Sequence, residues 1–219
     1  MKPNPHMFCL EREVLVELDR IVLHGTLRRP TTVQGVVLFA HGSGSSRHSP
    51  RNRAVADVLN TAGFATLLMD LLTETETGDR EKVFDVQLLA MRVAAADRWL
   101  TATPEWKSVP IGYFGASTGS AAALIATAKY TPGVSAIVSR GGRPDLAWHE
   151  LPAVAAPTLL IVGGDDEPVL GLNRRAFDRL TCPREIAVIP GATHLFEEPG
   201  TLDQVAELAR TWFTRHLQQ

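Results

Sequence analysis

Cysteine is scarce in this sequence of 219 residues, which contains only Cys9 and Cys182. Two cysteines cannot build the disulfide framework of a small secreted domain, and neither lies in a C-x-x-C or other metal-ligand spacing. The sequence therefore predicts a protein of a reducing compartment, with the cytoplasm as the default location.

An excess of charge of one sign is also lacking. Lys and Arg number 22 against 24 for Asp and Glu, the formal net charge is -2, and neither sign forms a long block. A surface for nucleic acid or for an anionic membrane has no electrostatic support. Long apolar runs are missing too, because Pro3, Pro5 and His6 interrupt the first ten residues and no run reaches membrane-spanning length. We expect no nucleic-acid partner, no membrane and no signal peptide, and the oligomeric state does not follow from the sequence.

What the chain does contain is a pattern of short apolar runs between helical segments. Residues 13–18 and 21–27 alternate apolar and polar positions around a turn, which predicts an antiparallel hairpin. The later runs are continuously apolar and too short for helices, as is typical of strands buried on both faces. These runs cover residues 35–40, 65–69, 111–114, 136–139, 158–162 and 185–189.

Helical periodicity appears between several of these runs. It predicts helices over residues 51–62, with Gly63 as a left-handed cap, over residues 81–100, and from 201 to about 217. A capping box at residues 201–204 is expected to start the last helix. Strands that alternate with helices require crossover connections, so the sequence predicts one α/β domain over residues 1–219, with a mostly parallel, doubly wound sheet and an N-terminal antiparallel hairpin.

The most informative motif follows the run at residues 111–114. There the chain reads Gly115-Ala-Ser117-Thr-Gly119 and continues into a segment of small, helix-forming residues, 120–128. This is G-x-S-x-G in a strand-turn-helix context, in which a strained turn lifts the serine to the edge of the sheet and the glycines allow close backbone approach. The motif predicts Ser117 as a nucleophile.

A serine hydroxyl needs a base and a carboxylate that orients this base. Asp165 and Asp166 follow the run at residues 158–162, and His194 follows the next run. Since ligands bind beyond the carboxyl ends of parallel strands, these side chains are candidates for one site. The chain order Ser, Asp, His is that of the α/β-hydrolases.

These motifs together resemble the α/β-hydrolase fold, and the small, uncapped chain is similar to its dienelactone hydrolase-like branch. The resemblance implies an acid in a G-x-x-D-x-x-V pattern, which selects Asp166 and leaves Asp165 and Asp145 as alternatives. It implies no metal or organic cofactor. Dienelactone hydrolases themselves use a cysteine nucleophile, so Ser117 favours a general carboxylesterase over a lactone-opening enzyme.

The same resemblance implies an oxyanion hole made of two backbone amides. One belongs to Thr118, the residue after the nucleophile, and the other to Ser43 in the His-Gly-x-Gly turn that follows residues 35–40. Arg140 and Arg143 follow another strand, and either guanidinium could bind an anionic group of the substrate. Salt bridges to Asp145 or Glu150 explain these two arginines equally well.

The predicted function is hydrolysis of small, short-acyl carboxylic esters through a Ser117-His194-Asp166 triad and an acyl-enzyme. Thioesters and lactones remain alternative substrates, because their hydrolysis uses similar geometry. A ligand-binding protein without activity is a further alternative. A nicotinamide-dependent reductase is the least favoured, since Arg47 replaces the third glycine of G-x-G-x-x-G and Pro50 lies in a loop inserted before the helix.

Overall fold

A single mixed β-sheet runs through the structure, a computed structural model that describes residues 10–217. The strands of the described chain follow the order β1-β2-β4-β3-β5-β6-β7-β8 across the sheet. They are β1 (Leu10–Leu18), β2 (Ile21–Arg29), β3 (Gly35–Ala40), β4 (Phe64–Met69), β5 (Ile111–Ala116), β6 (Ala136–Arg140), β7 (Thr158–Gly163) and β8 (Arg184–Ile189).

The hairpin β1-β2 is antiparallel and joins the sheet through β4, whereas the pairs from β4 to β8 are parallel. Strands β3 to β7 are buried along their whole length, because helices cover both faces. The fold class predicted from the sequence is thereby confirmed.

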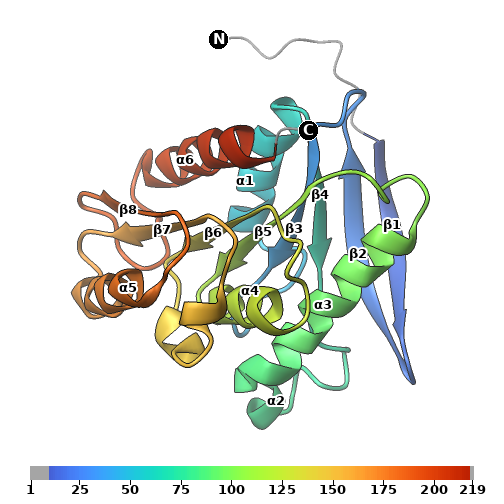
Figure 1. Cartoon of the computed structure of the whole chain (residues 1–219), viewed down its shortest axis with the longest axis horizontal. Helices are drawn as coiled ribbons and strands as arrows, with labels where there is room; N and C mark the ends of the chain where they lie inside the picture. Colours follow the sequence, from blue (N-terminus) through green and yellow to red (C-terminus); the bar gives the residue numbers. More distant parts are fainter. Residues whose placement is uncertain (1–9, 218–219) are drawn as a thin grey trace.

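Two layers of helices cover the sheet (Figure 1). Helices α1 (Pro50–Thr61) and α6 (Thr201–His216) pack together on one face, and α3 (Val86–Ala102), α4 (Thr118–Lys129) and α5 (Glu167–Arg179) cover the other. Each layer encloses its own apolar cluster, one around Phe39, Phe114 and Phe213 and the other around Leu38, Tyr113 and Leu124. Short elements α2 (Arg80–Phe84), η1 (Pro144–Ala147) and η2 (Leu151–Ala153) complete the described chain.

The register of the parallel strands brings their carboxyl ends to one edge. Ala40 pairs with Gly115, Ala116 with Arg140, and Gly163 with Ile189. The loops that follow these strands therefore start at similar heights, although they are far apart in the sequence. This edge of the sheet is the place where the predicted site residues can meet.

Three details of the sequence-based prediction are corrected. The helix expected over residues 81–100 is two helices, because the Asp85 carboxylate accepts hydrogen bonds from the amides of Gln87 and Leu88 and starts α3 anew. The capping box is wrong: the N-cap of α6 is Gly200, and the Thr201 hydroxyl instead donates to the Glu198 carbonyl. Helix α5 lies in a segment for which no helix was predicted.

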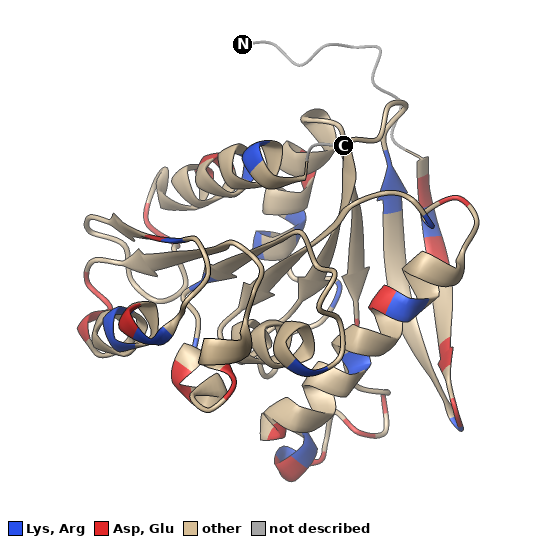
Figure 2. Cartoon of the chain, in the orientation of Figure 1, with Lys and Arg blue, Asp and Glu red and all other residues tan. Residues whose placement is uncertain are grey.

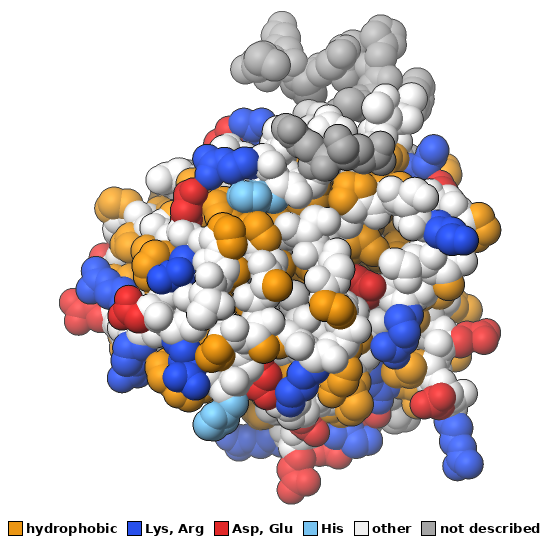
Figure 3. All heavy atoms as spheres, in the orientation of Figure 1, with side chains coloured by type: hydrophobic (Ala, Val, Ile, Leu, Met, Phe, Trp, Pro, Cys, Tyr) orange, Lys and Arg blue, Asp and Glu red, His pale blue; other side chains and the backbone are white. Residues whose placement is uncertain are grey.

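Charges of both signs are interspersed over the described elements (Figure 2). On the face seen in Figure 3, apolar side chains are scattered between charged ones. None of the helices in residues 10–217 is long and apolar enough to cross a membrane. Cys182 is buried and free, and Cys9 lies outside the described residues.

Candidate active site

Ser117 occupies a strained turn between β5 and α4. Its backbone has φ 52° and ψ -122°, values typical of the first central residue of a type II′ turn, where glycine is usual. Neighbouring residues must be small: a Cβ on Gly115 would lie 2.5 Å from the Ser120 Cα, and one on Gly119 would overlap the Ala40 carbonyl oxygen. The turn thus has the geometry that the G-x-S-x-G motif predicts.

Asp166 and His194 are brought into direct contact at the same edge of the sheet. Asp166 follows β7 as the N-cap of α5, and His194 lies in the loop after β8. The His194 Nδ1 lies 2.7 Å from the Asp166 Oδ2, with 12% of the aspartate side chain and 38% of the histidine side chain exposed. When Nδ1–H donates to the carboxylate, the neutral ring keeps its lone pair on Nε2 for a second partner.

The two alternative acids have other positions. The Asp165 side chain is exposed, and its amide donates to the Ala192 carbonyl. Asp145 accepts two hydrogen bonds of 2.8 Å from the Arg143 guanidinium. Of the three candidates, Asp166 is therefore the one that contacts His194.

Ser117 and His194 form no direct hydrogen bond within residues 10–217, but one loop lies against both. The Ser117 amide donates to the Arg140 carbonyl at 3.2 Å, and the Arg143 amide donates to the Ser117 carbonyl at 3.1 Å. Gly141 lies between Arg140 and Arg143 in the chain and packs closely against His194: a Cβ on Gly141 would lie 3.6 Å from the His194 Cε1. Hydrogen bonds between nucleophile and base often tighten only when substrate binds.

The two amides expected to form the oxyanion hole have different environments. Thr118 is the first residue of α4, so its amide has no acceptor within the helix. The Ser43 amide donates to the Thr118 hydroxyl at 2.9 Å, and the Ser43 hydroxyl lies 2.9 Å from the same oxygen. In this state the Thr118 hydroxyl occupies the position in front of the Ser43 amide.

His41 holds the peptide group that carries this amide. Its Nδ1 lies 2.9 Å from the Gly42 carbonyl oxygen, and its Nε2 accepts a hydrogen bond of 3.1 Å from the Leu71 amide. Nδ1 therefore carries the proton and donates it to Gly42. Burial lowers the pKa of His41, although the Gly42 carbonyl and the charge of Asp70 act in the opposite direction.

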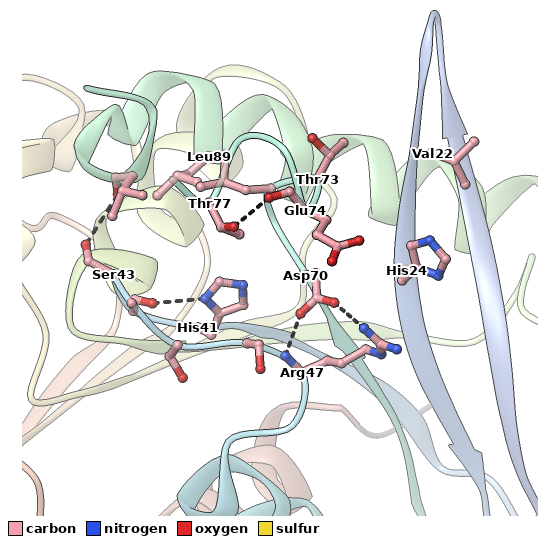
Figure 4. A pocket seen from close by; sticks show the side chains of 16 residues that line it. Val22, His24, His41, Ser43, Arg47, Asp70, Thr73, Glu74, Thr77 and Leu89 are labelled. Carbon is pink, nitrogen blue, oxygen red and sulfur yellow. Dashed lines mark hydrogen bonds and ion pairs between the residues drawn. The ribbon is translucent and has the colours of Figure 1, made fainter. Parts of the chain in front are cut away.

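A cavity of about 630 Å³ adjoins the Ser43 side of this edge (Figure 4). Ser43 and His41 lie at one end, and Val22 and His24 of β2 lie at the other. Asp70, which follows β4, binds the Arg47 backbone amide at 2.7 Å and the Arg47 guanidinium. The residues that line the cavity include Gly42, Ser43, Gly44, Ser45, Ser46, Asp70, Thr73, Glu74 and Thr77.

The two arginines singled out in the sequence differ in their partners. Arg143 forms an ion pair with Asp145, one of the two salt bridges that the sequence analysis offered to explain this residue. Arg140 is buried, with 8% of the residue exposed, and its Nε and Nη1 have no hydrogen-bond partner. Within residues 10–217, Arg140 therefore has no structural ion pair that would explain it.

Comparison with known proteins adds a decisive observation to this geometry. The family model described as "Dienelactone hydrolase family" matches residues 23–218, nearly the whole chain. The chain belongs to the dienelactone hydrolase family. Its resemblance to the dienelactone hydrolase-like branch of the α/β-hydrolases is thus confirmed.

Among solved structures, a dienelactone hydrolase from Anabaena variabilis is 52% identical, with a TM-score of 0.94 over 96% of this chain and 99% of that chain. Est1E from Butyrivibrio proteoclasticus is 16% identical with a TM-score of 0.79 over 93% and 98% of the two chains, which shows the shared fold. A Mycobacterium tuberculosis protein named "Putative phosphoribosyl transferase" is 56% identical over 207 residues. These cover 94% of this chain and 47% of that protein, so the chain spans about half the length of this relative.

In this dienelactone hydrolase family member, sequence reasoning missed one residue of the site. His41 was read only as part of the His-Gly-x-Gly turn, and its contacts with Gly42 and Leu71 were not predicted. Its position at the carboxyl end of a buried strand was the available signal. The donor to His41, the Leu71 amide just after β4, is brought close by the register of the sheet and is not visible locally.

Proposed function

We propose that this chain is a serine hydrolase that cleaves small carboxylic esters through an acyl-enzyme. The observation that carries the proposal is the combination of Ser117 in its strained turn with the Asp166–His194 hydrogen bond at the same edge of the sheet. A partly buried carboxylate that orients a histidine, next to a serine raised on a tight turn, is the arrangement required for nucleophilic acyl transfer.

In the proposed reaction, the Ser117 Oγ attacks the ester carbonyl carbon while the His194 Nε2 accepts the serine proton. The Asp166 carboxylate keeps the histidine in the tautomer with its proton on Nδ1 and stabilises the ring when it becomes positively charged. His194 then gives the proton to the oxygen of the leaving alcohol. Water attacks the acyl-enzyme with His194 as base, which releases the acid and restores Ser117.

In the proposed reaction, the amides of Thr118 and Ser43 donate hydrogen bonds to the carbonyl oxygen and stabilise the negative charge that develops on it. The helix that starts at Thr118 adds a favourable dipole at this point. For Ser43 to donate to the oxyanion, the Thr118 hydroxyl has to rotate away from the Ser43 amide. His41 keeps the Gly42–Ser43 peptide group in a single orientation during this exchange.

The proposed substrates are small, because no long insertion between the strands covers the site. The neighbouring cavity has a mixed lining, with hydroxyl side chains and the Arg47–Asp70 pair beside the apolar side chains of Val22, Leu72, Val83 and Leu89, and its volume of about 630 Å³ is that of a site for a small molecule. Thioesters and lactones would react through the same steps. The low cysteine content favours a reducing compartment such as the cytoplasm.

The test is hydrolysis of p-nitrophenyl esters from acetate to long acyl chains by the protein and by Ser117→Ala. We expect turnover of the short esters and a loss of about 10⁴- to 10⁶-fold in kcat for the variant. The matched control is Ser108→Ala, at an exposed turn residue, which should react like the wild type. Labelling of Ser117 by a fluorophosphonate reports the nucleophile without any choice of ester; an unlabelled protein would contradict the proposal.

A further inference from the structure

Asn173 is a fully buried polar side chain in the middle of α5, the helix that starts after Asp166. Its Nδ2 donates one hydrogen bond of 2.8 Å to the Val169 carbonyl of the same helix. The same nitrogen donates a second hydrogen bond of 3.0 Å to the Gly142 carbonyl, in the loop that follows β6. Both partners are acceptors, so the amide nitrogen has to face them and the amide oxygen faces elsewhere.

Stability alone does not explain an asparagine at this position. The Asn173 Oδ1 is buried and has no hydrogen-bond partner within residues 10–217. A buried acceptor without a donor costs free energy, and leucine, which has a similar shape, would avoid this cost. The hydrogen bond to Gly142 is the contact outside α5 that requires a polar side chain here.

Gly142 is the middle residue of a loop that contacts both the proposed nucleophile and the proposed base. On one side of it, Gly141 packs on His194: a Cβ on Gly141 would lie 3.2 Å from the His194 carbonyl oxygen and 3.6 Å from its Cε1. On the other side, the Arg143 amide donates to the Ser117 carbonyl at 3.1 Å. A shift of Gly142 would therefore be transmitted to both contacts.

The Gly142 peptide group is packed tightly against the sheet. A Cβ on Gly142 would lie 2.0 Å from the Ser139 Oγ and 2.5 Å from the Ser120 Oγ. Within the part of the chain that the structure describes, no backbone amide donates to the Gly142 carbonyl, and its donor is the Asn173 side chain. Because a buried carbonyl without a donor is unfavourable, loss of this side chain favours a rearrangement of the loop.

We infer that Asn173 is a positioning residue of the site, because its hydrogen bond to Gly142 fixes the loop that sets Ser117 and His194 relative to each other. This inference rests on the proposed function, which gives these two residues their roles. Helix α5 then has two functions: it presents Asp166 at its start, and it holds the loop between nucleophile and base. A displacement of about 1 Å between reacting groups lowers a rate by about 100-fold.

The first experiment is the kinetics of Asn173→Leu with p-nitrophenyl acetate. The substitution removes the amide and changes the size of the side chain little. We expect kcat to fall by about 10- to 100-fold and KM to stay within about threefold of the wild type, because the groups that bind the ester are retained. An unchanged kcat, or a raised KM with an unchanged kcat, would overturn the positioning role.

Asn60→Leu is the matched control. Asn60 is also buried, with 6% of the residue exposed, and its Nδ2 donates to the Phe64 carbonyl at 2.9 Å and to the Thr66 hydroxyl at 3.1 Å. Phe64 is the first residue of β4, so this asparagine lies at the opposite edge of the sheet from the site.

The Asn60 Oδ1 lies 3.5 Å from the Thr66 hydroxyl, whereas the Asn173 Oδ1 has no partner within residues 10–217. Asn60→Leu should therefore lower the free energy of unfolding in urea at least as much as Asn173→Leu, while its kcat stays that of the wild type. Equal losses of kcat in the two variants would show a general effect of destabilisation and overturn the inference. Asn173→Ala and Asn60→Ala replace the pair if a leucine variant does not fold.

The second experiment observes His194 without turnover, through the NMR resonances of its ring, assigned with His194→Gln. We expect these resonances to shift in Asn173→Leu, because Gly141 packs against the ring, and to stay in place in Asn60→Leu. A purely structural role of Asn173 predicts no difference between the two variants. Identical ring resonances in the wild type and in Asn173→Leu would overturn the inference.

The two experiments separate this inference from the proposed function. If the wild type hydrolyses no ester but the His194 resonances shift in Asn173→Leu alone, the hydrolase proposal fails and the positioning of His194 by Asn173 stands. If the wild type hydrolyses esters and Asn173→Leu keeps both its kcat and its His194 resonances, the hydrolase stands and the positioning role is wrong.

Discussion

Replacing Ser117 by glycine is expected to stabilise the protein relative to replacement by alanine, although glycine usually destabilises. At φ 52° and ψ -122° any residue with a Cβ is strained, and such strain amounts to about 1 to 3 kcal/mol. Both variants lack the hydroxyl, so the difference between them isolates the Cβ. Alanine retains the strain and glycine removes it.

The opposing effect is the larger conformational freedom of glycine in the unfolded chain. It destabilises a glycine variant relative to alanine by about 0.4 to 1 kcal/mol. Taking about 2 kcal/mol for the strain, we expect Ser117→Gly to be more stable than Ser117→Ala by about 1 kcal/mol. In a chain of 219 residues this corresponds to a rise in Tm of roughly 2 to 4 °C.

Urea unfolding with linear extrapolation measures this difference. The control pair is Ser108→Gly and Ser108→Ala, at an exposed turn residue without a positive φ, where alanine should be the more stable variant. The two sites should therefore differ in sign. A Ser117→Gly protein that is less stable than Ser117→Ala would refute the claim that the nucleophile turn stores strain.

Three further predictions concern the site and its support. Asp166→Asn should lower kcat for p-nitrophenyl acetate by about 10⁴-fold, whereas Asp145→Asn should change it little; equal losses would contradict the choice of acid. Gly119→Ala should lower the free energy of unfolding in urea by about 3 kcal/mol, because its Cβ would overlap a backbone oxygen, while Gly133→Ala, in open space, should be neutral. Burial lowers the pKa of His41 in the folded protein, so as the pH falls below about 6.5 the unfolded chain takes up a proton at His41 before the folded protein does. Stability should then fall by up to about 1.4 kcal/mol per pH unit, and His41→Gln should show a shallower fall in urea titrations at each pH; parallel curves would refute this origin.

The strands of the parallel sheet could be predicted from the sequence because their signal is local. A continuous apolar run such as residues 35–40 is compatible with burial on both faces, and Gly35–Ala40 is the strand found. The prediction of one helix over residues 81–100 was wrong because local hydrogen bonds start a new helix there, although the apolar periodicity continues. The stripe through residues 81–100 crosses Asp85, whose carboxylate caps a new helix without disturbing the apolar face.

Helix α5 shows a different limit of sequence reasoning. It starts directly after Asp166 with Glu167 and Pro168, and its buried residues are few, Leu170, Asn173 and Ala176. The buried positions 170, 173 and 176 recur at helical spacing on one face, so the segment is amphipathic and its helix was predictable from the sequence. With only three buried residues, the helix depends for its stability on the sheet surface that it covers.

By itself the sequence determined that a serine, an aspartate and a histidine follow three of the short apolar runs, in the order expected for this family. Only the tertiary structure decided that Asp166 rather than Asp165 or Asp145 meets His194, and that the Thr118 hydroxyl faces the Ser43 amide. The physical reason is distance along the chain. Partners 28 to 75 residues apart meet through strand register and loop path, and these are set by the packing of the whole sheet rather than by local propensity.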